Sequence, residues 1–497
     1  MTPTKPPGQG RFFSGSSSFS PLYVLIPVTT FALFWKLGAS SLAAWDEAIY
    51  AQVSKEILRG GDWLTLHWQY EPWFEKPPLF VWVTAILYRF LGVNEYGARA
   101  ASALSGVALV VLTYLIAKRA YDQRVGWLAA VILLTSYYFL SFSRFGTMEV
   151  MLSLFIYLTL YGYLRLKEGD EKWWYLIWTS CALALMAKGA GGLIAPAVLW
   201  LALFFDKRFA RTIQSRHFWQ AFLLAALLVA PWHILMYIRY ERAFIGEYIG
   251  YHVIARTTQT LEGHPTTHLY YLAKLIDGFF PWCLLAPFAV ASGVREILKG
   301  KSRSLIFLLV SALVFGLYTL IPTRRPWYIV PLFPALAVLI AAFLTNLFQA
   351  YRERPAHRRI IASLCVLLVT VGGLYSLLSL YLNSRGEEPI ARLARLAQST
   401  SAEDRQSLVL FSESEPFYAQ TPLFYSNRPI QQTYDTVKPA SEDASRYVNF
   451  TNLADVAQNS QKPIIFRQGD AARLATLYDI STVAEADALV YATIKRK

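Results

Sequence analysis

The sequence is poor in charged residues, which make up 16% of its 497 residues, while 55% are hydrophobic. Soluble domains carry about 25% charged residues, so this shortage excludes an ordinary soluble globular protein. Cysteine is scarce as well, because only Cys181, Cys283 and Cys365 are present, each inside an apolar run. Their spacing excludes a disulfide framework and a cysteine metal site. These absences predict a polytopic membrane protein.

The net charge of +14 is held in short basic clusters between long apolar runs. Such clusters are typical of the cytoplasmic loops of membrane proteins, so we expect no nucleic-acid partner. A bilayer is spanned by about 20 apolar residues in a helix, and we expect about eleven spanning helices, within a range of about 11 to 13. Their approximate positions are 20–40, 98–117, 125–142, 149–166, 172–188, 190–206, 217–237, 269–291, 304–321, 326–348 and 359–382.

The apolar segment from Pro78 to Leu91 is short for a span and predicts an interfacial or re-entrant helix. If it does not cross, every short basic cluster falls on one side, as the positive-inside rule requires. The opposite, outer side then receives a first loop at 41–99, a short turn at 143–149 and a later loop at 239–268. We therefore expect a multi-pass protein of the plasma (inner) membrane with its functional loops facing the periplasm or exterior.

Three parts of the chain are expected. Residues 1–19, rich in Ser, Gly and Pro, predict a disordered cytoplasmic N-terminus, and 20–382 form the transmembrane part. Residues 383–497 are polar and predict a small soluble α/β domain on the outer side. Within this domain we expect strands at 407–411 and 462–466 and helices at 389–398 and 470–478.

The first outer loop opens with WDEAIYAQVSKEILRGGDW, which predicts a short amphipathic helix on the membrane surface that stops at Gly60-Gly61. Asp46 stands where a helix N-cap would lie. It is also a candidate catalytic carboxylate, and the two roles are compatible. Glu75 and Lys76 follow in FEKPP beside an apolar segment, where charge is costly and usually indicates function or pairing.

These residues resemble a known family. WDEAIYAQVSKEILRGGDW followed by FEKPPLFVWVTAILYRFLGVNEYGARAASAL is similar to the aminoarabinose-transferase and protein-mannosyltransferase group (glycosyltransferase families 39 and 83), which has the GT-C fold. Weaker matches are SRFGTMEVMLSLF, ALMAKGAGGLIAP and RRPWYIVPLFPALA. The resemblance covers about residues 20–350. It implies an all-α membrane domain and a glycosyltransferase that takes its sugar from a polyprenyl phosphate, with inversion, outside the cytoplasm.

The resemblance also implies roles for individual residues. Asp46 becomes the leading catalytic residue, Lys76 and Tyr328 contact the donor phosphate, and Glu75 helps to hold a divalent metal cation. We also place Tyr50 among the phosphate-binding residues. Arg256 is a further candidate, because a guanidinium binds phosphate oxygens in a bidentate manner.

The sequence departs from the family in two places. Glu149 stands in the second outer turn where the family usually has Asp, so its catalytic role rests on a longer side chain. The metal-associated histidine has no unique counterpart, and His252 is preferred over His264 and His268 as the partner of Glu75. Lys188 is read as a snorkelling residue near a helix end. Arg324 and Arg325 are either phosphate ligands or interfacial anchors.

The expected function is a hexosyl- or pentosyltransferase whose acceptor is a lipid A-like glycolipid or envelope glycan rather than a protein. Its partners are a polyprenyl-phosphate sugar and membrane lipids. A transporter or lipid flippase is the main alternative, but such proteins place ionisable groups near the bilayer midplane, whereas here they gather in outer loops. A non-catalytic scaffold is a further alternative.

Overall fold

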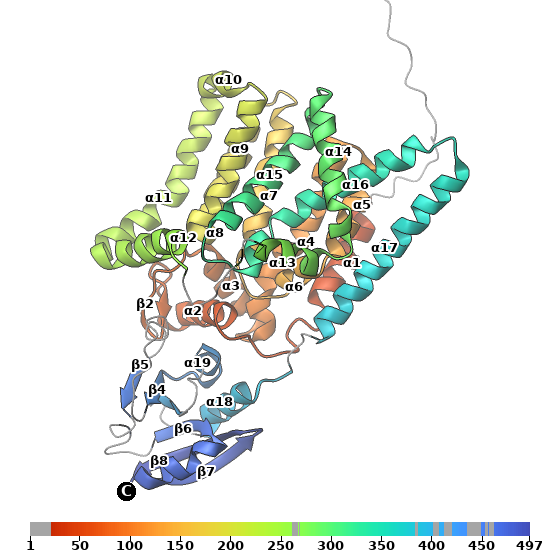
Figure 1. The fold of residues 1–497 in the computed structure, drawn as a ribbon. Helices are drawn as coiled ribbons and strands as arrows, with labels where there is room; N and C mark the ends of the chain where they lie inside the picture. Colours follow the sequence, from red (N-terminus) through yellow and green to blue (C-terminus); the bar gives the residue numbers. More distant parts are fainter. Residues whose placement is uncertain are drawn as a thin grey trace, which may run out of the picture.

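The structure is a computed structural model that describes residues 21–260, 267, 269–382, 386–400, 407–411, 420–434, 449–452, 456 and 462–497. A large helical bundle carries a smaller lobe, built on a β-sheet, at one end (Figure 1). The expected disordered segment 1–19 lies outside the described residues, as do His264 and His268.

The bundle is almost entirely helical, with one short β-hairpin. Its helices are α1 (Leu22–Phe34), α2 (Asp46–Gly60), α3 (Leu79–Leu91), α4 (Glu95–Ala120), α5 (Gln123–Leu134), α6 (Tyr137–Ser143), α7 (Glu149–Leu166), α8 (Trp173–Lys188), α9 (Ile194–Phe205), α10 (Phe209–Gln214), α11 (Arg216–Phe244), α12 (Arg256–Thr258), α13 (Tyr270–Phe279), α14 (Ala286–Leu298), α15 (Leu305–Leu320), α16 (Leu332–Ala350) and α17 (Pro355–Leu382). The hairpin is β1 (His67–Trp68) and β2 (Glu71–Pro72). Shorter helical segments are η1 (Gly189–Leu193), the π-helix η2 (Ile245–Ala255), η3 (Trp282–Leu284), η4 (Ser302–Ser304) and η5 (Pro326–Ile329).

Among the described residues, seven helices are long and apolar enough to cross a membrane, or eight if the bent pair α5 and α6 forms one crossing. This identifies an integral membrane protein but is fewer than the eleven crossings expected. The expected span at 20–40 is reduced to the 13 residues of α1. The expected span at 269–291 is interrupted at Pro281, which separates α13 from α14 because proline has no N–H to continue a helix.

The stretch from α8 to α9 is helical throughout but reverses direction at η1. Trp174, near the start of α8, and Leu203, near the end of α9, line one cavity at the same end of the bundle. The turn begins at Gly189, whose φ is +58°, a conformation that favours glycine. Separate helices at 172–188 and 190–206, as the sequence predicts, therefore describe this region better than one long helix.

Gly192→Ala is expected to destabilise the protein by about 1–3 kcal/mol, because overpacking at a rigid contact has that cost. A Cβ at Gly192 would lie 2.4 Å from the backbone of Ala184, so α8 and η1 would have to move apart. Gly316→Ala is the matched control, since no atom lies within 4 Å of a Cβ there. Thermal unfolding in detergent measures both; equal melting temperatures for the two variants would contradict the close approach.

The later outer loop differs from the sequence prediction. The segment 239–268 was expected to be a loop, but α11, η2 and α12 keep it helical as far as Thr258. Glu241, with φ of +43°, marks a kink within this path. Because the helical path continues, Arg256 is held on a defined element instead of a flexible connection.

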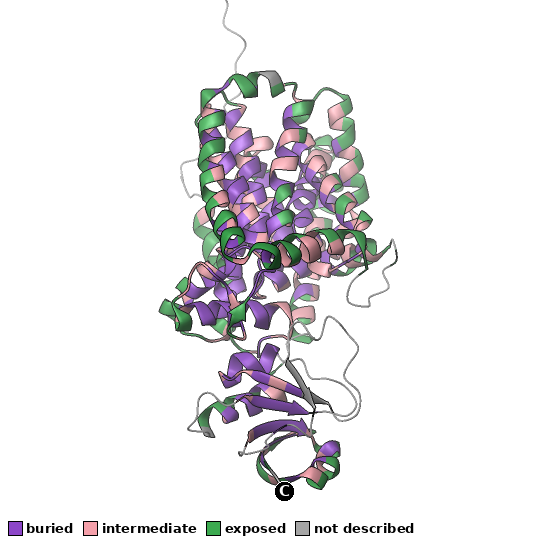
Figure 2. Cartoon of the chain, turned by 90° about the vertical axis from the view of Figure 1, so that its left-hand side faces the viewer, coloured by how far each residue is buried: buried purple, intermediate pink, exposed green. Residues whose placement is uncertain are grey.

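The smaller lobe confirms the strands and helices predicted for the C-terminal part. Its elements are α18 (Pro389–Thr400), β3 (Leu408–Phe411), α19 (Gln420–Ser426), β4 (Ile430–Tyr434), β5 (Asn449–Asn452), β6 (Lys462–Arg467), η7 (Gln468–Asp470), α21 (Ala471–Leu477), β7 (Tyr478–Ala486) and β8 (Leu489–Arg496). The strand order is β5-β4-β3-β6-β8-β7, with parallel pairing from β5 to β6 and antiparallel pairing at β8 and β7. Figure 2 shows the central strands buried, because helices cover them.

Helix α2 lies between the bundle and this lobe (Figure 1). It ends as the sequence predicts, with Gly61 as a left-handed cap at φ of +72°, but it begins at Asp46, one residue earlier than an N-cap at Asp46 would allow. Every residue from Glu47 to Ile57 is buried by protein, whereas the sequence predicts an amphipathic helix with one face on the membrane surface. Side chains of α2 share one apolar core with α19 and β3, among them Val53, Phe424 and Leu408. The lobe therefore covers the face that the sequence pattern assigned to lipid or solvent.

Candidate active site

A buried ion pair fixes the start of α2 against the bundle. Arg99 on α4 holds Glu47 through two contacts, Nε to Oε1 at 2.7 Å and Nη2 to Oε2 at 3.0 Å. Glu47 Oε1 also accepts a hydrogen bond from the backbone N–H of Gly146 at 2.9 Å. The first loop and the second outer turn, far apart in sequence, are therefore tied together beside Asp46 and Glu149. The sequence analysis named Glu47 only as the neighbour of Asp46 and missed this role.

Asp46 is the first residue of α2 and does not cap it. The N-cap position belongs to Trp45, and Asp46 has no side-chain capping bond, so the interpretation of Asp46 as an N-cap is wrong. Its half-buried carboxylate makes no hydrogen bond or salt bridge within the described part of the chain. The charge of Asp46 nevertheless acts on Lys76, Tyr50 and Glu149. A carboxylate so placed is available to a substrate.

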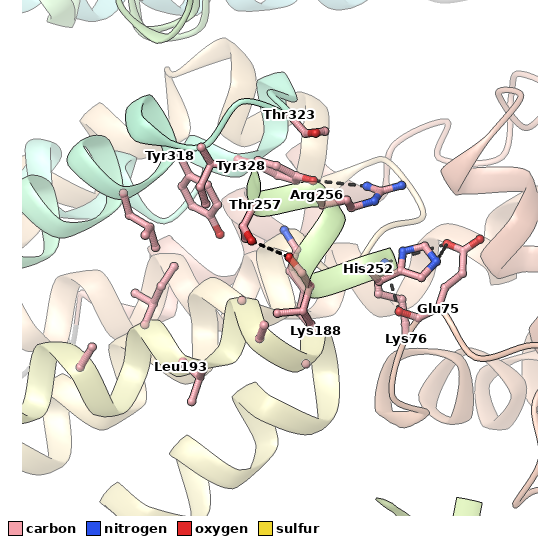
Figure 3. A pocket seen from close by; sticks show the side chains of 18 of the residues that line it. Glu75, Lys76, Lys188, Leu193, His252, Arg256, Thr257, Tyr318, Thr323 and Tyr328 are labelled. Atoms are coloured by element: carbon pink, nitrogen blue, oxygen red, sulfur yellow. Dashed lines mark hydrogen bonds and ion pairs between the residues drawn. The ribbon is translucent and has the colours of Figure 1, made fainter. Parts of the chain in front are cut away.

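A cavity of about 380 Å³ is lined by Lys76, on which the charge of Asp46 acts, although neither Asp46 nor Glu149 belongs to its lining. One wall is polar and contains Glu75, Lys76, Lys188, Arg256 and Tyr328. The other is apolar and comes from η1, α9 and α15. Figure 3 shows the polar side chains directed toward a common space from separate elements. The apolar lining residues are Leu193, Ile194, Ala197, Leu313, Leu317 and Ile321.

Lys76 lies in the cavity wall next to Glu75 and is largely buried. Burial lowers the pKa of Lys76 to about 8, because an ammonium loses hydration there, while the nearby Glu75 acts in the opposite direction. A cation held in a water-poor pocket interacts strongly with an incoming anion. Lys76 therefore suits the phosphate contact that the sequence predicts.

Arg256 and Tyr328 meet across the same cavity. The Arg256 Nη1 lies 3.5 Å from the Tyr328 hydroxyl, and Figure 3 shows both groups pointing into the space above Lys188. Tyr50, in contrast, does not line the cavity. It is buried edge-on against Trp73 and Phe80, and burial raises its pKa well above the usual value. The structure thus brings Arg256, Tyr328 and Lys76 together in the lining of one cavity. Tyr50 is not part of that lining.

Lys188 has a larger role in the candidate site than the sequence predicts. Instead of snorkelling to the membrane surface, it forms a buried salt bridge with Glu149, Nζ to Oε2, at 2.5 Å. Its ammonium also lies 4.4 Å from the centre of the Tyr328 ring. The signal in the sequence was the adjacent Gly189, which permits the sharp turn that brings the end of α8 into the cavity.

Glu75 and His252 form the pair preferred for metal binding. The Glu75 Oε2 and His252 Nε2 atoms lie 3.9 Å apart, and both side chains are buried. Ligand bonds to a divalent cation are about 2.0–2.2 Å long, so this separation fits two ligands of one ion. The described residues contain no group of three His, Cys, Asp or Glu that could hold a metal, so water or substrate oxygens would complete the shell.

Arg324 and Arg325 are at the edge of this region. Arg324 is buried and donates to the backbone carbonyls of Thr267 and Thr319. Arg325 places its guanidinium 5.6 Å from the centre of the Trp327 ring. Neither lines the cavity, so their contacts favour the anchoring alternative over phosphate binding.

Comparison with known proteins shows which proteins this chain resembles. The sequence profile of the dolichyl-phosphate-mannose-protein mannosyltransferase family matches residues 75–235. The undecaprenyl phosphate-alpha-4-amino-4-deoxy-L-arabinose arabinosyl transferase of Pectobacterium atrosepticum is 31% identical over 338 residues, which are 66% of this chain and 60% of that protein. The chain thus spans less than two thirds of the length of the curated relatives it matches.

Solved structures show the same fold over nearly the whole chain. The structure of ArnT from Cupriavidus metallidurans bound to undecaprenyl phosphate matches with a TM-score of 0.75 at 20% identity, covering 96% of this chain and 98% of the other. The Archaeoglobus fulgidus oligosaccharyltransferase matches with a TM-score of 0.61 at 12% identity, covering 94% and 74%. The class of protein is therefore a membrane protein of the GT-C fold.

Within that fold, the chain is similar in sequence to members of the aminoarabinose-transferase and protein-mannosyltransferase group. The resemblance in WDEAIY and FEKPP and the similarity of the whole fold point to the same group. The transporter alternative is not favoured by these similarities. The shared fold extends through the C-terminal lobe, because the match to ArnT covers almost the entire chain.

Proposed function

We propose that the protein is a glycosyltransferase that takes its sugar from a polyprenyl phosphate and transfers it, with inversion, to an acceptor hydroxyl. One observation carries this proposal: Lys76, Lys188, Arg256 and Tyr328 gather in one cavity beside the carboxylate of Asp46. Such a cluster of cations and a hydroxyl is suited to a phosphate. The similarity to the Pectobacterium transferase supports the same assignment.

The apolar wall of the cavity suits the lipid part of such a donor. Leu313 and Leu317 on α15 line the cavity together with Leu193 and Ile194. A prenyl chain loses its contact with water on entering such a groove, which contributes about 25 cal/mol for each Å² of apolar surface buried. A phosphate at the polar end and a prenyl chain at the apolar end would therefore be bound by one continuous site.

The chemistry follows from these placements. The acceptor O–H gives its proton to the Asp46 carboxylate as the acceptor oxygen forms a bond to the anomeric carbon. The bond from that carbon to the phosphate oxygen breaks, and its electron pair remains on the leaving phosphate. Lys76 and Arg256 stabilise the additional negative charge that develops there. Attack opposite the leaving group inverts the anomeric configuration.

Glu75 and His252, whose side chains lie 3.9 Å apart, would hold a divalent cation. Such an ion would supply further positive charge beside the leaving phosphate. Without it, Glu75 and His252 keep the loop of Lys76 against η2, since the two side chains meet at 3.9 Å. Metal binding at this pair is part of the proposal.

We further propose that the chain makes eleven crossings and that the cavity and the C-terminal lobe face the periplasm or exterior of the inner membrane. The return of α8 and α9 to one end supports a larger number of crossings than the number of long helices alone. The distribution of basic clusters supports the orientation. A lipid A-like glycolipid or an envelope glycan is the favoured acceptor.

The direct test uses the purified full-length protein in liposomes with a radiolabelled polyprenyl-phosphate sugar. Transfer of label to a glycolipid or glycan acceptor, with release of polyprenyl phosphate, is the expected result. Donors with aminoarabinose, mannose and other sugars are compared in parallel. If the protein moves intact labelled lipid across the bilayer and no label reaches an acceptor, the transferase assignment is wrong and transport takes its place.

Donor affinity is expected to fall as the pH rises through about 8. The pKa of Lys76 is lowered to about 8, so the group is mostly charged at pH 7 and mostly neutral at pH 9. If only the charged form binds the phosphate, the dissociation constant rises about fivefold between pH 8 and pH 9 and about twofold between pH 7 and pH 8. Titration of the protein with polyprenyl phosphate from pH 6.5 to pH 9.5 measures this dependence.

Lys76→Arg is the matched control, because a guanidinium stays charged over this pH range. Its pH dependence should be nearly flat between pH 7 and pH 9, even if its affinity at pH 7 differs. The same steep dependence in the Lys76→Arg variant would assign the titration to another group and exclude Lys76.

A further inference from the structure

A second polar pocket, of about 480 Å³, lies where the end of α2 meets the C-terminal lobe. Lys55 and Arg59 of α2, Arg395 of α18 and Glu95 of α4 are its charged lining residues. Asp46 and Arg59 stand at opposite ends of α2, about 20 Å apart for a helix of this rise. The pocket is therefore separate from the donor cavity, and the proposed function does not use it.

Three of the four charged lining residues of this pocket are cations. Arg395 is paired with Glu95 and with Glu387. Lys55 is 6% exposed and donates one hydrogen bond to the backbone carbonyl of Phe424, which leaves further N–H donors on its ammonium. Arg59 is exposed, and its Nη1 lies 3.5 Å from the Tyr70 hydroxyl. Lys55 and Arg59 thus both offer N–H donors at the pocket, and the carboxylate whose charge acts on Lys55 is that of Glu56. Burial lowers the pKa of Lys55 to about 7, and an anion bound beside it would raise that pKa.

One exposed apolar side chain lines the same pocket, and two more are exposed just before it in the sequence. Val93 lines it and is 43% exposed, and Phe90, at the end of α3, is 80% exposed. Leu91 between them is 38% exposed. Exposed aromatic and aliphatic side chains beside a basic pocket are the combination that recognises an anionic lipid at a membrane surface.

We propose that this pocket binds the phosphorylated headgroup of a membrane lipid, with the lipid's apolar chains along the exposed end of α3. The phosphate lies between Lys55 and Arg59, and the pocket volume leaves room for a glycerol or sugar unit next to it. Because α2 carries Asp46 at its other end and packs on α19, an occupied pocket holds the C-terminal lobe and the candidate active site in one arrangement. The same chemistry is offered by an anionic phospholipid and by a phosphorylated glycolipid.

The test measures lipid binding by the full-length protein and requires no sugar transfer, so it stands apart from the proposed activity. Lys76→Ala is used as the background, which removes the phosphate contact of the donor cavity. Dihexanoyl phosphatidylglycerol is the anionic probe and dihexanoyl phosphatidylcholine the zwitterionic one. Adding Arg59→Gln is expected to raise the dissociation constant for phosphatidylglycerol about tenfold, as for loss of one charged contact.

Arg392→Gln is the matched control, since Arg392 is exposed on α18 but lies outside the pocket lining. It should leave the affinity unchanged. An unchanged affinity in the Arg59→Gln variant, or equal binding of the two phospholipids, would overturn the proposal. Loss of all binding in the Lys76→Ala background would do the same, because it would assign the lipid to the donor cavity.

A third probe identifies the source of the headgroup. A soluble phosphorylated disaccharide glycolipid is compared with phosphatidylglycerol at equal charge. If the glycolipid binds more tightly than phosphatidylglycerol and this binding is lost in the Arg59→Gln variant, the pocket holds a glycolipid acceptor by its phosphate. Equal binding of both, lost in the same variant, supports an anionic phospholipid of the membrane.

Discussion

Asp46→Asn is expected to lower the rate of sugar transfer by about 10²–10⁴-fold, the usual contribution of a general base. The carboxylate does not cap α2 and makes no salt bridge within the described residues, so its loss removes no contact on which the fold depends. The asparagine keeps the shape of the side chain but cannot take the acceptor proton. Single-turnover transfer in liposomes measures the change, and thermal unfolding should show a melting temperature like that of the wild type.

Glu47→Gln serves as the contrasting variant. Glu47 is the neighbour of Asp46, but its carboxylate is held by Arg99 and Gly146. Its loss should lower stability, because it leaves the buried guanidinium of Arg99 without its anionic partner. If Asp46→Asn transfers sugar at nearly the wild-type rate, Asp46 is not the base.

Loss of one member of the Lys188 and Glu149 pair is expected to destabilise the protein by about 3–5 kcal/mol, since it leaves an uncompensated buried charge. The salt bridge is 2.5 Å long and both side chains are buried. Lys188→Met and Glu149→Gln are suitable because each removes charge and keeps volume. Chemical unfolding in detergent measures the free energy of unfolding of the two single variants. The variants that fold are then assayed for sugar transfer.

The double variant separates stability from activity. With both charges removed, much of the lost stability should return, because no unpaired charge remains. Activity should stay low, since Lys188 lines the cavity near Tyr328 and Glu149 lies beside Asp46. A double variant as active as the wild type would limit the pair to a structural role.

Local sequence patterns predicted much of the secondary structure. The existence of α2 and its stop at Gly60-Gly61 follow from turn residues and helical spacing, although its N-cap is Trp45 and not Asp46. The strands β3 and β6 follow from short apolar runs within a polar context. The number of membrane crossings could not be predicted in the same way. An apolar run that looks continuous in composition can be divided by a break, such as the one at Pro281.

Composition and motifs alone determined that this is a membrane protein and that Asp46, Glu75, Lys76, Glu149 and Arg256 are candidates for one site. Those features depend on residue type and local spacing. The tertiary structure decided that Lys188 turns inward to Glu149, that Glu47 rather than Asp46 anchors α2, and that the C-terminal lobe buries that helix. These are contacts between segments far apart in the chain, and no local pattern encodes which buried charge meets which partner.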